Sequence, residues 1–377
     1  MKFCVVGPTY PFKGGISHFT TMLVEQLRLH HNVDFISFKR QYPRWLFPGK
    51  AEPDPSNHTL HCACEYLLDP MNPLTWLKTF FRIKRETPDI LVLQWWTPFW
   101  TPTLAALATL VKRYTPVPIL FLCHHTTPPD GGAFDWTLGL TVLSRGDEFI
   151  VLSETDFADL RRALPHASIH LARHPTYEVF NLNRLDRATV RAELGYTPDD
   201  RVLLFFGFVR RYKGLNHLLQ ALALIPEETQ VKLLVVGEFW EPENGYQTRA
   251  EQLGVARRVQ MVNRYVPNEE LGRYFSAADV VVLPYLEATQ SGIAQIAFGF
   301  EVPVITTSVG GLPETVRDGE FGLVVPPQDD GLLAEAIVRY FEEDLGPGFQ
   351  EKIRAERDIF SWERLAALIE TIFEGKA

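Results

Sequence analysis

The sequence predicts an α/β protein built from two doubly wound, parallel-sheet domains of the Rossmann-like type. Its 377 residues exceed a single hydrophobic core, which stops growing at about 250 to 300 residues. Short apolar runs rich in Val, Leu and Ile alternate with helix-like segments, as buried parallel strands and their crossover helices should. The alternation occurs twice, which predicts two sheets rather than one.

Each half of the chain contains six candidate strands. In the first half they are KFCVVG, VDFIS, DILVLQWW, PILFLCHH, EFIVLSE and SIHLAR. In the second half they are RVLLFFGF, VKLLVVG, VQMVN, DVVVLPY, VPVITT and GLVVPP. Residues 42–73, dense in proline and aromatic side chains, are expected to form a long loop.

The domain boundary is expected near Pro175, because residues 173–187 carry a proline and polar residues without a clear period. The first domain then covers residues 1–175 and the second covers residues 176–357. The last segment, 358–377, has a helical apolar period and a capping serine at Ser361. We expect this helix to pack back on the first domain.

Composition excludes several classes of protein. A formal charge of −9 argues against a nucleic-acid groove, which needs a net basic face. Four scattered cysteines predict a reducing cytoplasm and no disulfide framework, since the first residues form a strand pattern rather than a signal peptide. No apolar run reaches the length of about 18 residues that a membrane-spanning helix needs.

The cluster His61-Cys62-Ala63-Cys64 lacks a second pair of ligands at zinc-site spacing. We therefore expect an irregular loop there and no metal.

The loop after the first strand places Gly14 and Gly15 just before a helical pattern. Adjacent glycines let a ligand approach the backbone, and a helix N-terminus attracts anions. This loop is either a phosphate site or a flexible turn. It lacks the GxGxxG pattern of dinucleotide binders.

Cations follow the first strand of the second domain. Arg210 and Lys213 lie beyond the carboxyl end of that strand, where open α/β sheets bind ligands, and they could face a diphosphate. Arg211 fits a solvated surface charge at least as well.

A polar turn with Glu287 precedes a helix whose start is rich in small residues, including Ser291, Gly292 and Ile293. Such a turn can accept hydrogen bonds from sugar hydroxyls and donate backbone hydrogen bonds to phosphate. A helix cap with no further role is the alternative. Gly310 and Gly311 after the next strand predict a close backbone approach or a plain turn.

Two histidines, His124 and His125, end a strand of the first domain. At least one of them is expected in the ligand site at the carboxyl ends of the strands, although a structural role stays open.

Trp95 and Trp96 follow another strand and could stack on an acceptor or pack inside the domain. Residues 73–85 mix aromatic and basic side chains, which fits either peripheral contact with an anionic membrane or an ordinary crossover helix.

Together these segments resemble the retaining glycosyltransferases of GT-B fold known as family four. The resemblance covers nearly the whole chain. It rests on an ordered series: GGI, HH, HPTYEVF, FFGFVRRYKGL, LLVVGE, PYLEATQSGIAQIAFGFEVPVITTSVGGLPE and GLVVPP.

The resemblance implies that the two domains face a cleft, and it assigns roles to residues. Gly15, beside Gly14, would donate its N–H to the donor diphosphate, and His124 would lie beside the transferred sugar. Lys213, in the loop that starts at Gly207, would hold the diphosphate. Glu287 would bind sugar hydroxyls, supported by the amides of residues 291–293.

The sequence departs from the family pattern at two positions. Phe208 stands where an arginine is common, so Arg210 becomes the candidate for the second cation. Gln295 stands where a second glutamate holds the ribose; its neutral amide hydrogen-bonds more weakly than a carboxylate.

The resemblance implies a retaining hexosyltransferase of polysaccharide or glycolipid biosynthesis, which takes a sugar from a nucleotide-diphosphate sugar. The acceptor would be a hydroxyl of a glycan, a lipid-linked molecule or a small molecule. No cofactor and no metal are expected, since the cations would stabilise the leaving diphosphate. We expect a cytoplasmic enzyme, with contact to the inner membrane face left open. Two alternatives remain: a nucleotide-sugar epimerase of the same fold, and a non-catalytic nucleotide-sugar scaffold.

Overall fold

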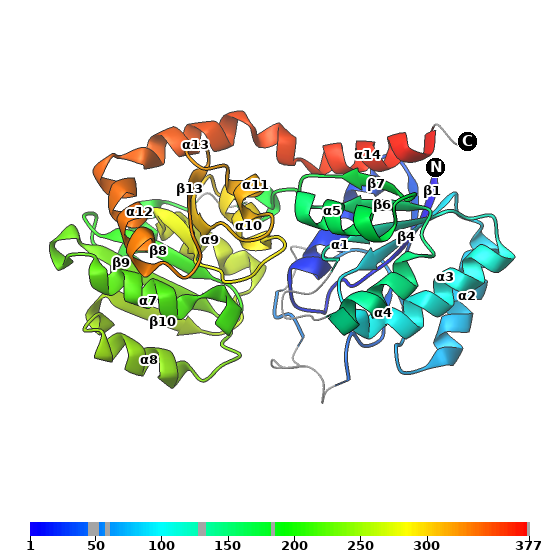
Figure 1. Ribbon diagram of the computed structural model, residues 1–377, viewed down its shortest axis with the longest axis horizontal. Coiled ribbons are helices and arrows are strands. Elements are labelled where there is room, and N and C mark those ends of the chain that lie inside the picture. The colour runs from blue at the N-terminus through cyan, green and yellow to red at the C-terminus, as the bar shows by residue number, and fades with distance from the viewer. Residues whose placement is uncertain (44–52, 57–60, 127–132, 182–184, 375–377) are drawn as a thin grey trace. The chain divides into compact units, whose positions relative to one another are not determined.

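A computed structural model describes residues 1–43, 53–56, 61–126, 133–181 and 185–374. The chain forms two compact units (Figure 1). Unit 1 comprises Met1–Asp54, Leu60–Arg173 and Ser361–Ala377, and unit 2 comprises Pro55–Thr59 and His174–Phe360.

Unit 1 contains a seven-stranded parallel sheet in the order β3-β2-β1-β4-β5-β6-β7. The strands are β1 (Lys2–Val6), β2 (Asn32–Phe38), β3 (Glu65–Leu68), β4 (Ile90–Trp95), β5 (Ile119–Cys123), β6 (Glu148–Val151) and β7 (Ser168–Leu171). The helices are α1 (Gly15–Arg28), α2 (Pro73–Glu86), α3 (Thr101–Tyr114), α4 (Ala133–Leu143), α5 (Glu154–Ala163) and α14 (Trp362–Glu374).

Side chains of the unit 1 strands alternate between two covered faces. Cys4 and Val6 belong to one buried cluster with Phe80 of α2 and Leu104 of α3. Phe3, buried on the other face, contacts the ring of His31. Because both faces of the central strands β1, β4, β5 and β6 are covered, these strands read as continuous apolar runs.

Unit 2 contains a six-stranded parallel sheet in the order β10-β9-β8-β11-β12-β13. The strands are β8 (Arg201–Phe206), β9 (Val231–Gly237), β10 (Val259–Asn263), β11 (Val280–Leu283), β12 (Val304–Thr307) and β13 (Gly322–Val325). The helices are α6 (Arg187–Glu193), α7 (Leu215–Leu224), α8 (Glu243–Gln252), α9 (Leu271–Ala277), α10 (Gly292–Gly299), α11 (Leu312–Val316), α12 (Asp330–Glu342) and α13 (Leu345–Ala355). The predicted pair of doubly wound parallel sheets is confirmed.

The strand order reverses direction once in each sheet. In unit 1 the chain moves outward from β1 to β3 and then returns to place β4 on the other side of β1. In unit 2 the chain moves outward from β8 to β10 and then returns to place β11 on the other side of β8. Open α/β sheets bind ligands beyond the carboxyl ends of the strands at this reversal, so the loops after β1, β4, β8 and β11 are the places to examine.

The expectation of a loop over residues 42–73 was wrong in part. Glu65–Leu68 forms the edge strand β3, which pairs with β2 and shifts register between Ser37 and Phe38. Residues 44–52 and 57–60 of the same stretch lie outside the described residues.

The C-terminal helix α14 lies against α1 within unit 1 (Figure 1). The rings of Phe19 and Trp362 are 5.0 Å apart, and the Nε2 of His31 lies 2.7 Å from the Oε1 of Glu370. The N–H of Arg364 donates to the Oγ of Ser361 at 3.3 Å, so this serine caps the helix.

Candidate active site

The loop after β8 brings Gly207 and Lys213 together with the start of α10. Gly207 has a φ of 107°, which favours glycine. A Cβ atom on Gly207 would lie 3.0 Å from the Nζ of Lys213 and 3.3 Å from the Cδ1 of Ile293. Three predicted donor-site residues therefore meet at the strand reversal of unit 2.

Lys213 is buried, with 8% of its surface exposed. Burial, and to a lesser extent the nearby charge of Arg210, lowers the pKa of Lys213 to about 7. Its Nζ lies 5.4 Å from the centre of the Tyr285 ring, and within the described chain it forms no ion pair with a carboxylate. A buried ammonium in this setting is stabilised by an incoming anion.

Arg210 lies against two aromatic rings. Its Cζ is 4.8 Å from the centre of the Tyr212 ring and 4.9 Å from the centre of the Trp240 ring. Cation–π contacts with both rings limit where the guanidinium can lie. Phe208, which occupies the position where the family commonly has arginine, lies 4.9 Å from the same tryptophan ring and 6.0 Å from the ring of Tyr265.

The turn between β11 and α10 carries the remaining predicted donor-site residues. Glu287 is exposed. Ser291 is buried and is the N-cap of α10, where its side chain accepts from the N–H of Ala294 at 3.4 Å. Gly292 and Ile293 open the helix, so their N–H groups lack intrahelical acceptors. The predicted cap is present, and it leaves anion-binding amides at the same helix end.

Gln295 is buried, with 1% of its surface exposed. Among the described residues neither its Nε2 nor its Oε1 has a hydrogen-bond partner. An unsatisfied buried polar group lowers the free energy of unfolding by about 1 to 3 kcal/mol. This amide therefore destabilises the protein unless a ligand forms hydrogen bonds with it. It lies on α10, one turn after the N-terminal amides.

Two glycines hold these loops together by backbone contact. A Cβ on Gly214 would lie 1.8 Å from the carbonyl oxygen of Pro284, and a Cβ on Gly310 would lie 1.7 Å from that of Ala288. The N–H of Gly311 donates to the carbonyl of Thr289 at 2.9 Å. At Gly310 the chain therefore lies close to the backbone of the turn before α10.

In unit 1, His124 follows β5 and is buried. Its Nε2 lies 2.7 Å from the Oε1 of Gln94 on β4, and its ring meets the ring of Phe19 edge to face at 4.7 Å. Burial lowers the pKa of the next residue, His125, although the charge of Asp156 raises it. Asp156 in turn accepts from the N–H and the Oγ1 of Thr126. The sequence placed both histidines at this strand end, and they lie there.

Gly14 is the N-cap of α1 with a φ of 109°. Gly15 begins the helix and is exposed, and a Cβ placed on it would meet nothing within 4 Å. A side chain at this position would therefore find open space, and the N-terminus of a helix attracts anions.

Trp95 and Trp96 do not lie at the surface. Both belong to the buried cluster of unit 1, and the Nε1 of Trp96 donates to the hydroxyl of Tyr42 at 2.9 Å. The acceptor-side assignment of these two residues is therefore replaced by packing inside the domain. Large apolar rings at the end of a strand covered on both faces are buried with it.

Sequence reasoning missed Tyr285 and Trp240. Tyr285 lies two residues after β11 with its ring against Lys213, and Trp240 lies three residues after β9 with its ring against Arg210. Their positions just after strands were the available signal. The described residues contain no group of three or more His, Cys, Asp or Glu side chains that could hold a metal ion.

Comparison with known proteins gives the family. Residues 13–175 match the family described as Glycosyltransferase Family 4, and residues 200–343 match the one described as Glycosyl transferases group 1. The chain belongs to the family-four glycosyltransferases.

Relatives of this glycosyltransferase include a D-inositol 3-phosphate glycosyltransferase of Nocardioides sp., 32% identical over 211 residues, which are 51% of this chain and 45% of the relative. An uncharacterized glycosyltransferase of Methanocaldococcus jannaschii is 28% identical over 191 residues, 49% of this chain and 48% of that protein. The chain spans about half the length of these curated relatives.

Solved structures match over the whole length of the glycosyltransferase. Sucrose-phosphate synthase from Thermosynechococcus elongatus has a TM-score of 0.75 at 23% identity and covers 99% of this chain and 98% of its own. Anabaena HepE in complex with UDP has a TM-score of 0.78 at 17% identity, with both chains fully covered. At these identities the likeness establishes the fold, which is GT-B.

Proposed function

We propose that this glycosyltransferase moves a hexose-type sugar from a nucleoside-diphosphate sugar to an acceptor hydroxyl with retention of configuration. The observation that carries the proposal is the buried amide of Gln295, which has no hydrogen-bond partner among the described residues and lies on the same helix as the amides of Gly292 and Ile293. Its donor and acceptor atoms suit the two hydroxyls of a ribose, while the helix end and Lys213 suit a diphosphate.

In this proposal the protein stabilises the charge that grows on the leaving diphosphate. Lys213 and Arg210 supply two positive charges, and the helix amides supply preorganised donors. Burial makes these contacts stronger than they would be in water. The exposed carboxylate of Glu287 would accept hydrogen bonds from the hydroxyls of the sugar.

Retention follows in this proposal from attack of the acceptor hydroxyl on the leaving-group side. The bond from the anomeric carbon to the phosphate oxygen breaks, the new bond forms to the acceptor oxygen, and the phosphate takes the acceptor proton. On unit 1 we keep the roles that the resemblance implies, which place His124 beside the transferred sugar and Gly15 as a backbone donor to phosphate.

The test is calorimetric titration with UDP, GDP and ADP and their common sugar conjugates, without metal, starting with UDP because HepE was solved with it. We expect one nucleotide to bind, and Lys213→Ala to weaken it by about tenfold or more, the loss expected for one charged contact of more than 1.4 kcal/mol. Arg211→Ala, at the exposed neighbour of Arg210, is the matched control and should bind normally.

Glu287→Ala should lower turnover more than nucleotide affinity, because it contacts the sugar rather than the diphosphate. Product NMR then reads the anomeric configuration. Failure of every nucleotide to bind the folded protein would contradict the proposal, and an inverted product would contradict retention alone.

A further inference from the structure

Helix α2 exposes large apolar side chains on the side that faces away from its core. Leu74 is 67% exposed, Leu77 is 44% exposed and Phe81 is 62% exposed. These residues are spaced three, four and seven apart, so they form one stripe along the helix. Met71, just before the helix, and Tyr114, at the end of α3, are also exposed.

The opposite side of α2 is already occupied. Thr79, Phe80 and Ile83 are buried against the unit 1 sheet and α3, and α2 and α3 lie side by side (Figure 1). The ring of Phe80 lies 6.0 Å from the ring of Tyr114, so the end of α3 packs beside α2. The exposed stripe is a second apolar face, separate from the face that packs in the core.

Basic side chains lie on α2 and on the neighbouring end of α3. Lys78 and Lys84 on α2 and Arg113 on α3 are exposed, and the part of the chain that the structure describes gives none of the three an ion-pair partner. A helical spacing puts Lys78 and Lys84 on the two edges of the stripe. The surface is therefore apolar along its middle and cationic along its edges.

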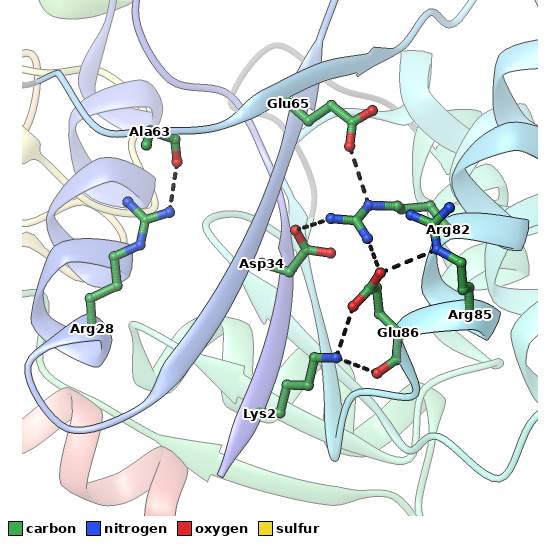
Figure 2. A network of polar contacts seen from close by, with 8 residues as sticks. All are labelled: Lys2, Arg28, Asp34, Ala63, Glu65, Arg82, Arg85 and Glu86. Carbon is green, nitrogen blue, oxygen red and sulfur yellow. Dashed lines mark hydrogen bonds and ion pairs between the residues drawn. The ribbon is translucent and has the colours of Figure 1, made fainter.

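Three carboxylates beside α2 are paired with three other cations. Figure 2 shows the Arg82 guanidinium directed at Asp34, Glu65 and Glu86, with Lys2 and Arg85 also bound to Glu86. On α3 the Nζ of Lys112 lies 2.8 Å from Asp147. The free lysines and arginine of the surface thus keep their charge for a partner, although the whole chain carries −9.

We propose that this surface, formed by Leu74, Leu77, Lys78, Phe81, Lys84 and Arg113, binds the surface of an anionic lipid bilayer without crossing it. An apolar stripe with Lys and Arg at its borders is the arrangement by which amphipathic helices enter the headgroup region. A second copy of the chain is the less suitable occupant, because a two-fold contact sets the same cations against each other. Among the described residues no helix is long and apolar enough to cross the bilayer.

Vesicle sedimentation of the full chain tests this proposal. We expect binding to vesicles of equal phosphatidylglycerol and phosphatidylcholine, and binding at least about tenfold weaker to phosphatidylcholine alone, since each cation near an anionic surface contributes about 1 kcal/mol. Raising the salt from about 0.02 M to about 0.3 M should also weaken binding, because it shortens the Debye length.

Two variants separate the apolar and the charged contributions. Lys78→Glu with Lys84→Glu, and Leu77→Ser with Phe81→Ser, should each lower binding by about tenfold or more. The matched control is Leu224→Ser with Leu332→Ser, two exposed leucines of unit 2, and it should bind as the unchanged protein does. Circular dichroism verifies that each variant folds.

Three results would overturn the proposal. One is that the unchanged protein does not sediment with anionic vesicles at low salt. Another is that the α2 variants bind as tightly as the control. The third is that the protein is a dimer by light scattering and becomes a monomer in Leu77→Ser with Phe81→Ser, which would assign the face to self-association. Nucleotide binding is measured in parallel and does not depend on any of these results.

Discussion

The Nζ of Lys213 lies 3.0 Å from the position that a Cβ atom would take on Gly207. The lysine therefore reaches across the start of its own loop and lies over the glycine backbone. This contact places a buried ammonium at the strand reversal of unit 2, and the first two predictions depend on it.

Gly207→Ala should weaken nucleotide binding as well as stability. The φ of 107° strains any side chain, and the added methyl group would displace Lys213. We expect a loss of about 1 to 3 kcal/mol in the free energy of unfolding and a weaker affinity in calorimetry. Gly254→Ala is the control: its φ is 73°, but a Cβ there meets nothing within 4 Å, so stability should fall while affinity stays unchanged.

Nucleotide-sugar affinity should fall as the pH rises above about 7. Free Lys213 has a pKa of about 7, and a bound diphosphate raises that pKa, so the complex holds a proton that the free protein has lost. Affinity should then drop by up to about tenfold per pH unit above 7 and stay level below it. Calorimetry in two buffers of different ionisation enthalpy should show proton uptake at pH 8.

The Lys213→Arg variant is the control for this pH dependence. Arginine keeps its charge throughout this range, so proton uptake should disappear. If the same pH dependence persists in this variant, Lys213 is not the group that titrates.

Gln295→Leu should stabilise the free protein and weaken nucleotide binding. The substitution removes a buried amide whose two polar atoms have no partner among the described residues, which should raise the free energy of unfolding by about 1 kcal/mol or more. Thermal unfolding with and without nucleotide measures both effects. Gln252→Leu, at an exposed glutamine of α8, should change neither. Destabilisation of the free protein by Gln295→Leu would mean that the amide is satisfied within the fold.

Arg210 should depend on the ring of Trp240 for its position. Trp240→Leu removes one of the two aromatic contacts of the guanidinium and should weaken diphosphate binding, while Arg210→Ala should weaken it further. Adding Phe208→Arg to Arg210→Ala should restore part of the affinity, because an arginine at that position is common in the family. No recovery in the double variant, with the protein folded, would count against Arg210 as the replacement cation.

The sequence was sufficient to predict twelve of the strands in the described part of the chain, because the central parallel strands, covered on both faces, are recognisable from composition alone. It missed β3, since Glu65 and Tyr66 are exposed at the edge of the sheet and leave no apolar run. It also located the strand-end loops of the candidate site. It could not show that Trp95 is buried or that the Gln295 amide lacks a partner within the described chain, because both depend on neighbours distant in sequence.

The close backbone approaches at Gly214 and Gly310 fix the course of the loops after β8 and β11, whichever side chains those loops carry elsewhere. Each loop passes so close to a neighbour's carbonyl group that a side chain at the glycine has no room. Exposed positions such as Glu287 can therefore be exchanged while the loop keeps its course. This property makes the site a favourable target for directed evolution, in which sugar preference is changed one side chain at a time.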